Sequence, residues 1–125
     1  MLGYVTLGTN DIKKAVEFYD GLVAVIGGSR MMEQETFVAW TTGDGAPGIA
    51  VTVPFDGQVA TAGNGTMVAI AVDTVEEVQA LHAKALELGG QDEGAPGPRG
   101  EEGFYAGYFR DLDGNKLNAF CMVAS

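Results

Sequence analysis

The hydrophobic and polar positions along the chain change period several times, and the order of the periods predicts the secondary structure. Residues 4–9 alternate as a strand with Val5 and Leu7 on one face, and apolar residues then recur at helical spacing over 11–22. Glycine-rich turns interrupt the chain afterwards, around further strand candidates at 30–35, 36–42 and 49–53. The first part of the chain is therefore predicted to run β-α-β-β-β.

The same succession of patterns starts again after residue 66. Residues 67–72 read as a strand, and an apolar stripe through 74–88 predicts a second helix, ended by two glycines. Residues 104–110 and 115–122 are predicted strands joined by a turn at Asp111–Asn115. The glycine- and proline-rich stretch 91–103 is predicted to be a loop with room for one short extra strand.

The two halves align at a constant offset of 63 residues, which places Tyr4 on Met67 and Leu7 on Ile70. We interpret this match as an internal duplication. The predicted fold is α+β, with tandem β-α-β-β-β modules forming a mixed-sheet cup and the helices outside it. The expected single domain, 1–125, has module one at about 1–55, a linker at 56–65 and module two at about 66–125.

Composition narrows the classes of partner. The net charge is −10 and the seven basic residues form no patch, so nucleic acid is not an expected partner, whereas an acidic surface would attract a cationic small molecule. No apolar run approaches 18 residues and the N-terminus does not resemble a signal peptide, so no membrane association is expected. The single cysteine, Cys121, falls in an apolar strand pattern and is expected in the core, which suits a reducing cytoplasm.

Two segments carry a resemblance to a known family. The opening VTLGTNDIKKAVEFYDGL and the closing YFRDLDGNKLNAF, together with the duplicated plan, resemble the glyoxalase/bleomycin-resistance/extradiol-dioxygenase superfamily, also called vicinal oxygen chelate proteins, over nearly the whole chain. In its metal-using members a divalent metal lies in the cup, commonly held by His from the first strand and Glu from the last strand of each module. The resemblance places these four positions at Tyr4, Ala50, Met67 and Asn118.

None of these four side chains is a good ligand for a divalent metal. The only histidine, His82, lies in the middle of the second predicted helix and is expected at the helix surface. We therefore expect neither a metal nor another cofactor. The residues predicted to bind a ligand share the inward face or come from neighbouring strands: Tyr4, Thr6, Trp40, Met67, Tyr108, Asn118 and Phe120.

The resemblance leaves two main functions open. The first is a protein that binds a small organic molecule in the cup, as bleomycin-resistance-like members sequester a drug. The second is a lyase-, isomerase- or dioxygenase-type enzyme with a divergent site, in which Tyr4 donates a proton or hydrogen bond and Arg110 holds an anion. A structural or regulatory subunit is a third, weaker reading. Whether the chain forms a homodimer, and which molecule it binds, do not follow from the sequence.

Overall fold

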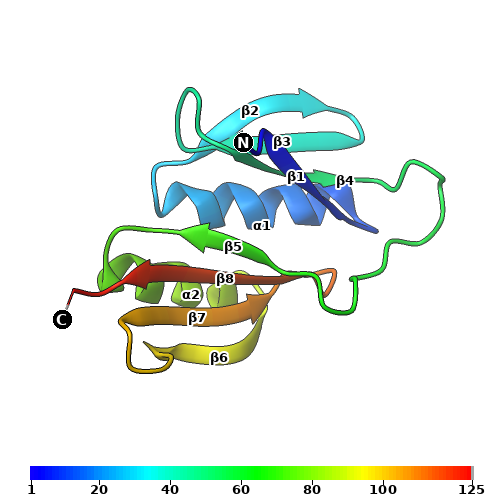
Figure 1. The fold of residues 1–125 in the computed structure, drawn as a ribbon. Coiled ribbons are helices and arrows are strands. Elements are labelled where there is room, and N and C mark those ends of the chain that lie inside the picture. Colours follow the sequence, from blue (N-terminus) through cyan, green and yellow to red (C-terminus); the bar gives the residue numbers. More distant parts are fainter. Residues whose placement is uncertain (125) are drawn as a thin grey trace.

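The computed structural model describes residues 1–124 and contains the two expected modules, each a four-stranded sheet with one helix (Figure 1). The first module consists of β1 (Tyr4–Gly8), α1 (Ile12–Ala24), β2 (Ser29–Gln34), β3 (Phe37–Thr41) and β4 (Gly48–Thr52). The second consists of β5 (Val68–Ala71), α2 (Val75–Glu87), β6 (Gln91–Pro98), β7 (Phe104–Arg110) and β8 (Lys116–Met122). The predicted α+β fold is confirmed, and β6 forms within the stretch that was expected to be mainly loop.

The two sheets have the same topology. The strand order is β1-β4-β3-β2 in the first sheet and β5-β8-β7-β6 in the second. In each sheet the first and last strands of the module pair in parallel, and the other pairs are antiparallel. The equivalent residues of the duplication, Tyr4 and Met67, therefore stand at the beginning of equivalent edge strands.

Side-chain oxygens bind the free amides at the start of both helices. Thr74 accepts a hydrogen bond from the Glu77 amide at 3.1 Å and caps α2. In α1 the cap is Asp11, which accepts from the Lys14 amide, and the neighbouring Asn10 does not cap the helix. The Asn10 side chain instead binds both the amide and the carbonyl of Ala60 in the connection between the modules.

The modules meet through their helix-bearing sides. Helices α1 and α2 contact each other, and α1 lies between the first sheet and β5 (Figure 1). One continuous core joins the two modules and includes Phe18 and Leu22 from α1 and Leu81 from α2. Each helix covers one face of its own sheet, and the helix-free faces lie on the outside of the chain, where Tyr4 is 52% exposed and Met122 61%. A single chain therefore does not close the two helix-free faces into one cup.

The predicted turn at Asp111–Asn115 links the modules. The Asp111 carboxylate accepts hydrogen bonds from the amides of Asp113 and Asn115, and its other oxygen accepts from the Tyr19 hydroxyl of α1 at 2.7 Å. The Asn115 amide group also donates to the carbonyl of Gly8 at 3.0 Å. Burial, followed by the nearby Asp111 carboxylate, raises the pKa of Tyr19 well above its usual value.

The structure tests two further expectations, the burial of the single cysteine and the absence of a membrane-spanning helix. Cys121 is buried on the α2 side of β8, as its apolar pattern predicts. Among residues 1–124, no helix is long and apolar enough to cross a membrane.

Candidate functional site

The helix-free face of the second sheet gathers three of the predicted ligand-binding residues. Leu117, Ala119 and Cys121 of β8 belong to the core, so the alternating residues Asn118 and Phe120 face the other way. Tyr108 of β7 pairs directly with Asn118, so its side chain is on the same face. The sequence placed Asn118 and Phe120 on this face, whereas it left the direction of the Tyr108 side chain open.

Asn118 has an unusual environment on this face. The residue is 1% exposed and is flanked in register by Tyr108 on β7 and Ala69 on β5. Its Oδ1 is the one buried side-chain nitrogen or oxygen in the described residues that has no hydrogen-bond partner. An unpaired buried amide oxygen costs about 1–3 kcal/mol. No group of the described chain relieves this cost. A molecule that donates a hydrogen bond to Oδ1 of Asn118 would therefore bind more tightly.

Two cations lie over the ring of Tyr108. The Arg99 guanidinium carbon is 5.4 Å from the ring centroid and the Lys116 amine is 5.5 Å from it. Neither Arg99 nor Lys116 was predicted from the sequence as a binding residue. Lys116 could have been found, since it lies two residues before Asn118 and therefore on the same strand face, but no local pattern in the stretch 91–103 indicates where Arg99 points.

The far end of the same face is aromatic. Phe104 of β7 and Phe120 of β8 stack with their ring centroids 5.3 Å apart. Phe104 was not predicted, although it shares the parity of Tyr108 along β7. The face therefore changes along the strands from basic side chains, through the Asn118 amide, to an aromatic pair.

Arg110, the predicted anion holder, is already paired. Its guanidinium forms a salt bridge through Nε with Glu93 and donates through Nη1 to the carbonyl of Gly114 at 2.8 Å. Its charge is therefore largely matched by Glu93 within the chain.

The helix-free face of the first sheet carries Tyr4 and Thr6. The Tyr4 ring meets Phe37 edge-to-face at 5.8 Å between centroids. Ala39 and Ala50 lie between these two positions in the register and are almost completely buried. Tyr4 is exposed, and it does not belong to the shared core. One chain thus presents Tyr4 and Asn118 on two separate surfaces.

Trp40 lies on the opposite side of its sheet from Tyr4. Its ring is buried, packs 5.5 Å from Tyr19 and donates through Nε1 to Asp20 at 2.8 Å. Hydrogen bonds from Arg30, offset in part by desolvation and supported by the Trp40 bond, lower the pKa of Asp20. Trp40 therefore does not share a face with Tyr4 and Thr6. The apolar pattern of β3 does not show to which side of the sheet its side chain points.

His82 is buried rather than at the helix surface, which corrects the prediction. Its Nε2 lies 3.0 Å from an Asp92 carboxylate oxygen, and its ring meets Phe109 edge-on. Gly107 leaves space for this ring, because a Cβ there would come within 3.3 Å of His82 Cδ2. His82 therefore lies on the helix-covered side of the second sheet and not at the candidate site.

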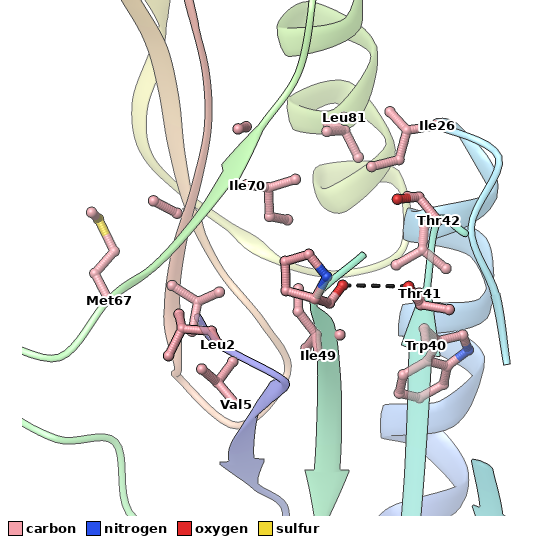
Figure 2. Close-up of a pocket in the computed structure, with 16 residues that line it drawn as sticks. Leu2, Val5, Ile26, Trp40, Thr41, Thr42, Ile49, Met67, Ile70 and Leu81 are labelled. Carbon is pink, nitrogen blue, oxygen red and sulfur yellow. Dashed lines mark hydrogen bonds between the residues drawn. The ribbon is translucent and has the colours of Figure 1, made fainter. Parts of the chain in front are cut away.

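A pocket of about 530 Å³ lies between the modules on the helix-bearing side (Figure 2). In Figure 2 Val5 and Ile49 point into it from the first module, with Ile70 and Leu81 from the second, while the Met67 side chain lies apart from this group. Trp40 and Met67 are the predicted residues that line it. Its lining side chains are almost all apolar, and the Thr41 hydroxyl is occupied by backbone carbonyls. This pocket has the volume of a ligand site but few polar groups to orient a ligand.

Comparison with known proteins decides the family. The sequence pattern of the Glyoxalase/Bleomycin resistance protein/Dioxygenase superfamily matches residues 1–119. The chain belongs to this superfamily. No protein of curated function matches it.

Solved structures of the superfamily share the whole fold of the chain. A glyoxalase/bleomycin resistance protein from Albidiferax ferrireducens T118 is 32% identical, with a TM-score of 0.89 over 98% of this chain and 99% of that one. A family enzyme from Burkholderia phytofirmans PsJN is 22% identical, with a TM-score of 0.77 over 97% and 98%. The fosfomycin resistance protein FosX from Mesorhizobium loti is 15% identical, with a TM-score of 0.68 over 98% and 92%. The last two likenesses concern the fold alone.

The metal positions of the superfamily do not fit a divalent metal in this chain. Tyr4 and Met67 stand at the first strands, Ala50 and Asn118 on the last strands, and none supplies a carboxylate or imidazole. Ala50 is fully buried, and Asn118 offers only a neutral amide. Within residues 1–124 no group of three or more His, Cys, Asp or Glu side chains is placed to hold a metal ion.

Proposed function

We propose that this superfamily member binds a small organic molecule against the helix-free sheet faces, without the usual metal site. The observation that carries the proposal is the Asn118 amide, which is buried with an unpaired oxygen beside the aromatic and apolar part of a face whose other end is basic. Small-ligand sites commonly combine such an apolar surface with a few polar groups that orient the ligand. In this proposal the protein acts by binding the molecule, and it is located in the cytoplasm.

We further propose that a second copy of the chain completes the site. In one chain the faces that carry Tyr4 and Asn118 lie apart, and β1 and β5 are both free sheet edges. Large apolar side chains remain exposed on or beside these faces, among them Tyr4, Met31, Met67 and Met122. Pairing the first module of one copy with the second module of the other would cover these side chains and oppose Tyr4 to Asn118.

The test uses a neutral fluorescent probe, N-phenyl-1-naphthylamine, titrated into the full chain. Phe120→Ala removes the aromatic pair on the proposed face and is expected to raise the probe Kd by about tenfold. Leu2→Ala is the matched control, because Leu2 lines the pocket between the modules and is itself exposed. If Leu2→Ala weakens binding and Phe120→Ala does not, the ligand occupies that pocket and the proposal fails.

Elemental analysis of protein purified without chelator belongs to the same test. We expect no stoichiometric Zn, Ni, Mn or Fe. About one transition metal per chain, lost in Asn118→Ala, would contradict the metal-free site.

A further inference from the structure

We infer that the molecule bound on the helix-free face of the second sheet is an organic anion with an aromatic body and a hydrogen-bond donor. This inference rests on the proposed function and adds the chemical class of the ligand. It opposes the expectation, drawn from the net charge of −10, that the protein attracts cations. The local distribution of charge on this face differs from that of the whole surface.

Three of the seven basic residues, Arg99, Arg110 and Lys116, gather around Tyr108 on this face. Arg110 and Lys116 are directly opposite each other in the β7–β8 register. Like charges at such a pair repel and destabilise the sheet. Glu93 compensates Arg110 alone, so the face keeps an excess of positive charge that a bound anion would offset.

Arg99 and Lys116 differ from the other basic residues. Arg30, Lys84 and Arg110 form salt bridges, while Lys13 and Lys14 are exposed on α1.

Arg99 and Lys116 are half-buried and, among the described residues, form no ion pair. In the described residues the Arg99 guanidinium donates to neutral backbone carbonyls, those of Ala95, Gly97 and Pro98 at 2.7, 2.9 and 3.4 Å. These bonds orient the guanidinium and leave its charge unmatched.

Asn118 provides the second, independent sign of a ligand. It lies two residues beyond Lys116 on β8, roughly 7 Å along the same face, and Phe120 follows after the same interval. Oδ1 of Asn118 accepts hydrogen bonds and has no donor. The order along β8 is therefore cation, acceptor and aromatic ring, which matches an aromatic acid carrying a hydroxyl or N–H group between its charge and its ring.

A pair of probes that differ only in charge tests the ligand class. 1-Anilinonaphthalene-8-sulfonate is an aromatic anion with an N–H donor, and N-phenyl-1-naphthylamine is the same molecule without the sulfonate. Lys116→Gln is expected to raise the Kd of the sulfonate by about tenfold, the size of one charge-assisted hydrogen bond, and to leave the Kd of the neutral probe unchanged. Lys14→Gln removes the same charge from an exposed helix position and is expected to change neither Kd.

Arg99→Gln is a second variant with the same expected selectivity, but its lost carbonyl bonds also loosen β6, so Lys116→Gln decides. The inference is overturned if Lys116→Gln leaves the sulfonate Kd unchanged or weakens both probes equally. A different result is expected if the proposed function itself is wrong, because Phe120→Ala would then leave the Kd of both probes unchanged. If Phe120→Ala weakens both probes while Lys116→Gln affects neither selectively, the binding face stands and the anionic class is wrong.

Discussion

At the scale of single residues, Tyr19 shows how a few buried polar groups hold the modules in place. Its ring is completely buried in α1, and its hydroxyl reaches Asp111 in the turn of the other module. The bond joins positions 92 residues apart in the sequence. The Asp111 carboxylate also organises its own turn, so one side chain serves both the local hairpin and the contact between modules.

We predict that Tyr19→Phe lowers the free energy of unfolding by about 1–3 kcal/mol at pH 7, because the buried Asp111 loses a donor. The pKa of Tyr19 is raised in the folded chain, so above about pH 10 the unfolded chain releases this proton while the folded chain retains it. Stability from this group is therefore complete below pH 10 and is lost as the pH rises further. Urea denaturation at pH 7 and above about pH 10 measures the free energy of unfolding of both chains.

The phenylalanine variant is expected to lose less stability between pH 7 and alkaline pH than the parent chain. Tyr4→Phe is the matched control, since it removes the hydroxyl of an exposed tyrosine outside the shared core. Equal alkaline slopes for Tyr19→Phe and the parent would show that the buried phenol does not contribute in this way.

Residue-level sequence reasoning succeeded where strand alternation alone sets the direction of a side chain. It placed Asn118 and Phe120 on the helix-free face because β8 alternates cleanly. It left Trp40 undecided because β3 is apolar on both faces, with Val38, Ala39 and Trp40 all buried. It misplaced His82 because a helix position between Leu81 and Ala83 gives no sign that Asp92 and Gly107 will surround it.

At the scale of elements, α2 illustrates how local sequence sets a boundary. Thr74 accepts from the Glu77 amide, and the Glu77 carboxylate accepts from the Asp73 amide at 3.1 Å. This reciprocal arrangement is a close variant of the capping box. Both helices were predictable to within two residues because their caps and apolar stripes are local features.

We predict that Thr74→Ala destabilises the protein by about 1 kcal/mol, the usual cost of losing a capping hydroxyl. Thr61→Ala, in the exposed connection between the modules, is the control and should cost much less. Thermal or urea unfolding measures both. Equal stability of the two variants would mean that the Thr74 bond contributes nothing to α2.

Strand β6 could not be predicted with the same certainty, because its pairing is irregular and not local. Its register with β7 shifts at two places, and Gly94 there has φ of +152°. The Arg99 side chain folds back onto the carbonyls of this strand. These features place the basic side chain over Tyr108, and they depend on β7 rather than on the sequence of β6.

At the scale of the whole molecule, the duplication was readable but the way its halves meet was not. Matching apolar faces at an offset of 63 predict two similar modules. The same apolar pattern is compatible with halves that meet through their sheets or through their helices. In the structure the helices meet, and the shared core of α1, α2 and both sheets decides this arrangement. The helix-free faces are left to a second copy in our proposal.

Complementation between two defective subunits shows directly whether two copies of the chain share the binding site. Tyr4→Ala and Phe120→Ala each remove an aromatic side chain from a different face, and each variant alone is expected to lose binding of N-phenyl-1-naphthylamine. A purified mixed dimer contains one subunit of each variant. Because each site combines the first module of one copy with the second module of the other, one site would carry both changes and the other site neither. We predict that such a dimer recovers tight binding at about half of its sites. A mixed dimer that recovers no binding, or a chain that stays monomeric while binding the probe, would contradict a site shared between two copies.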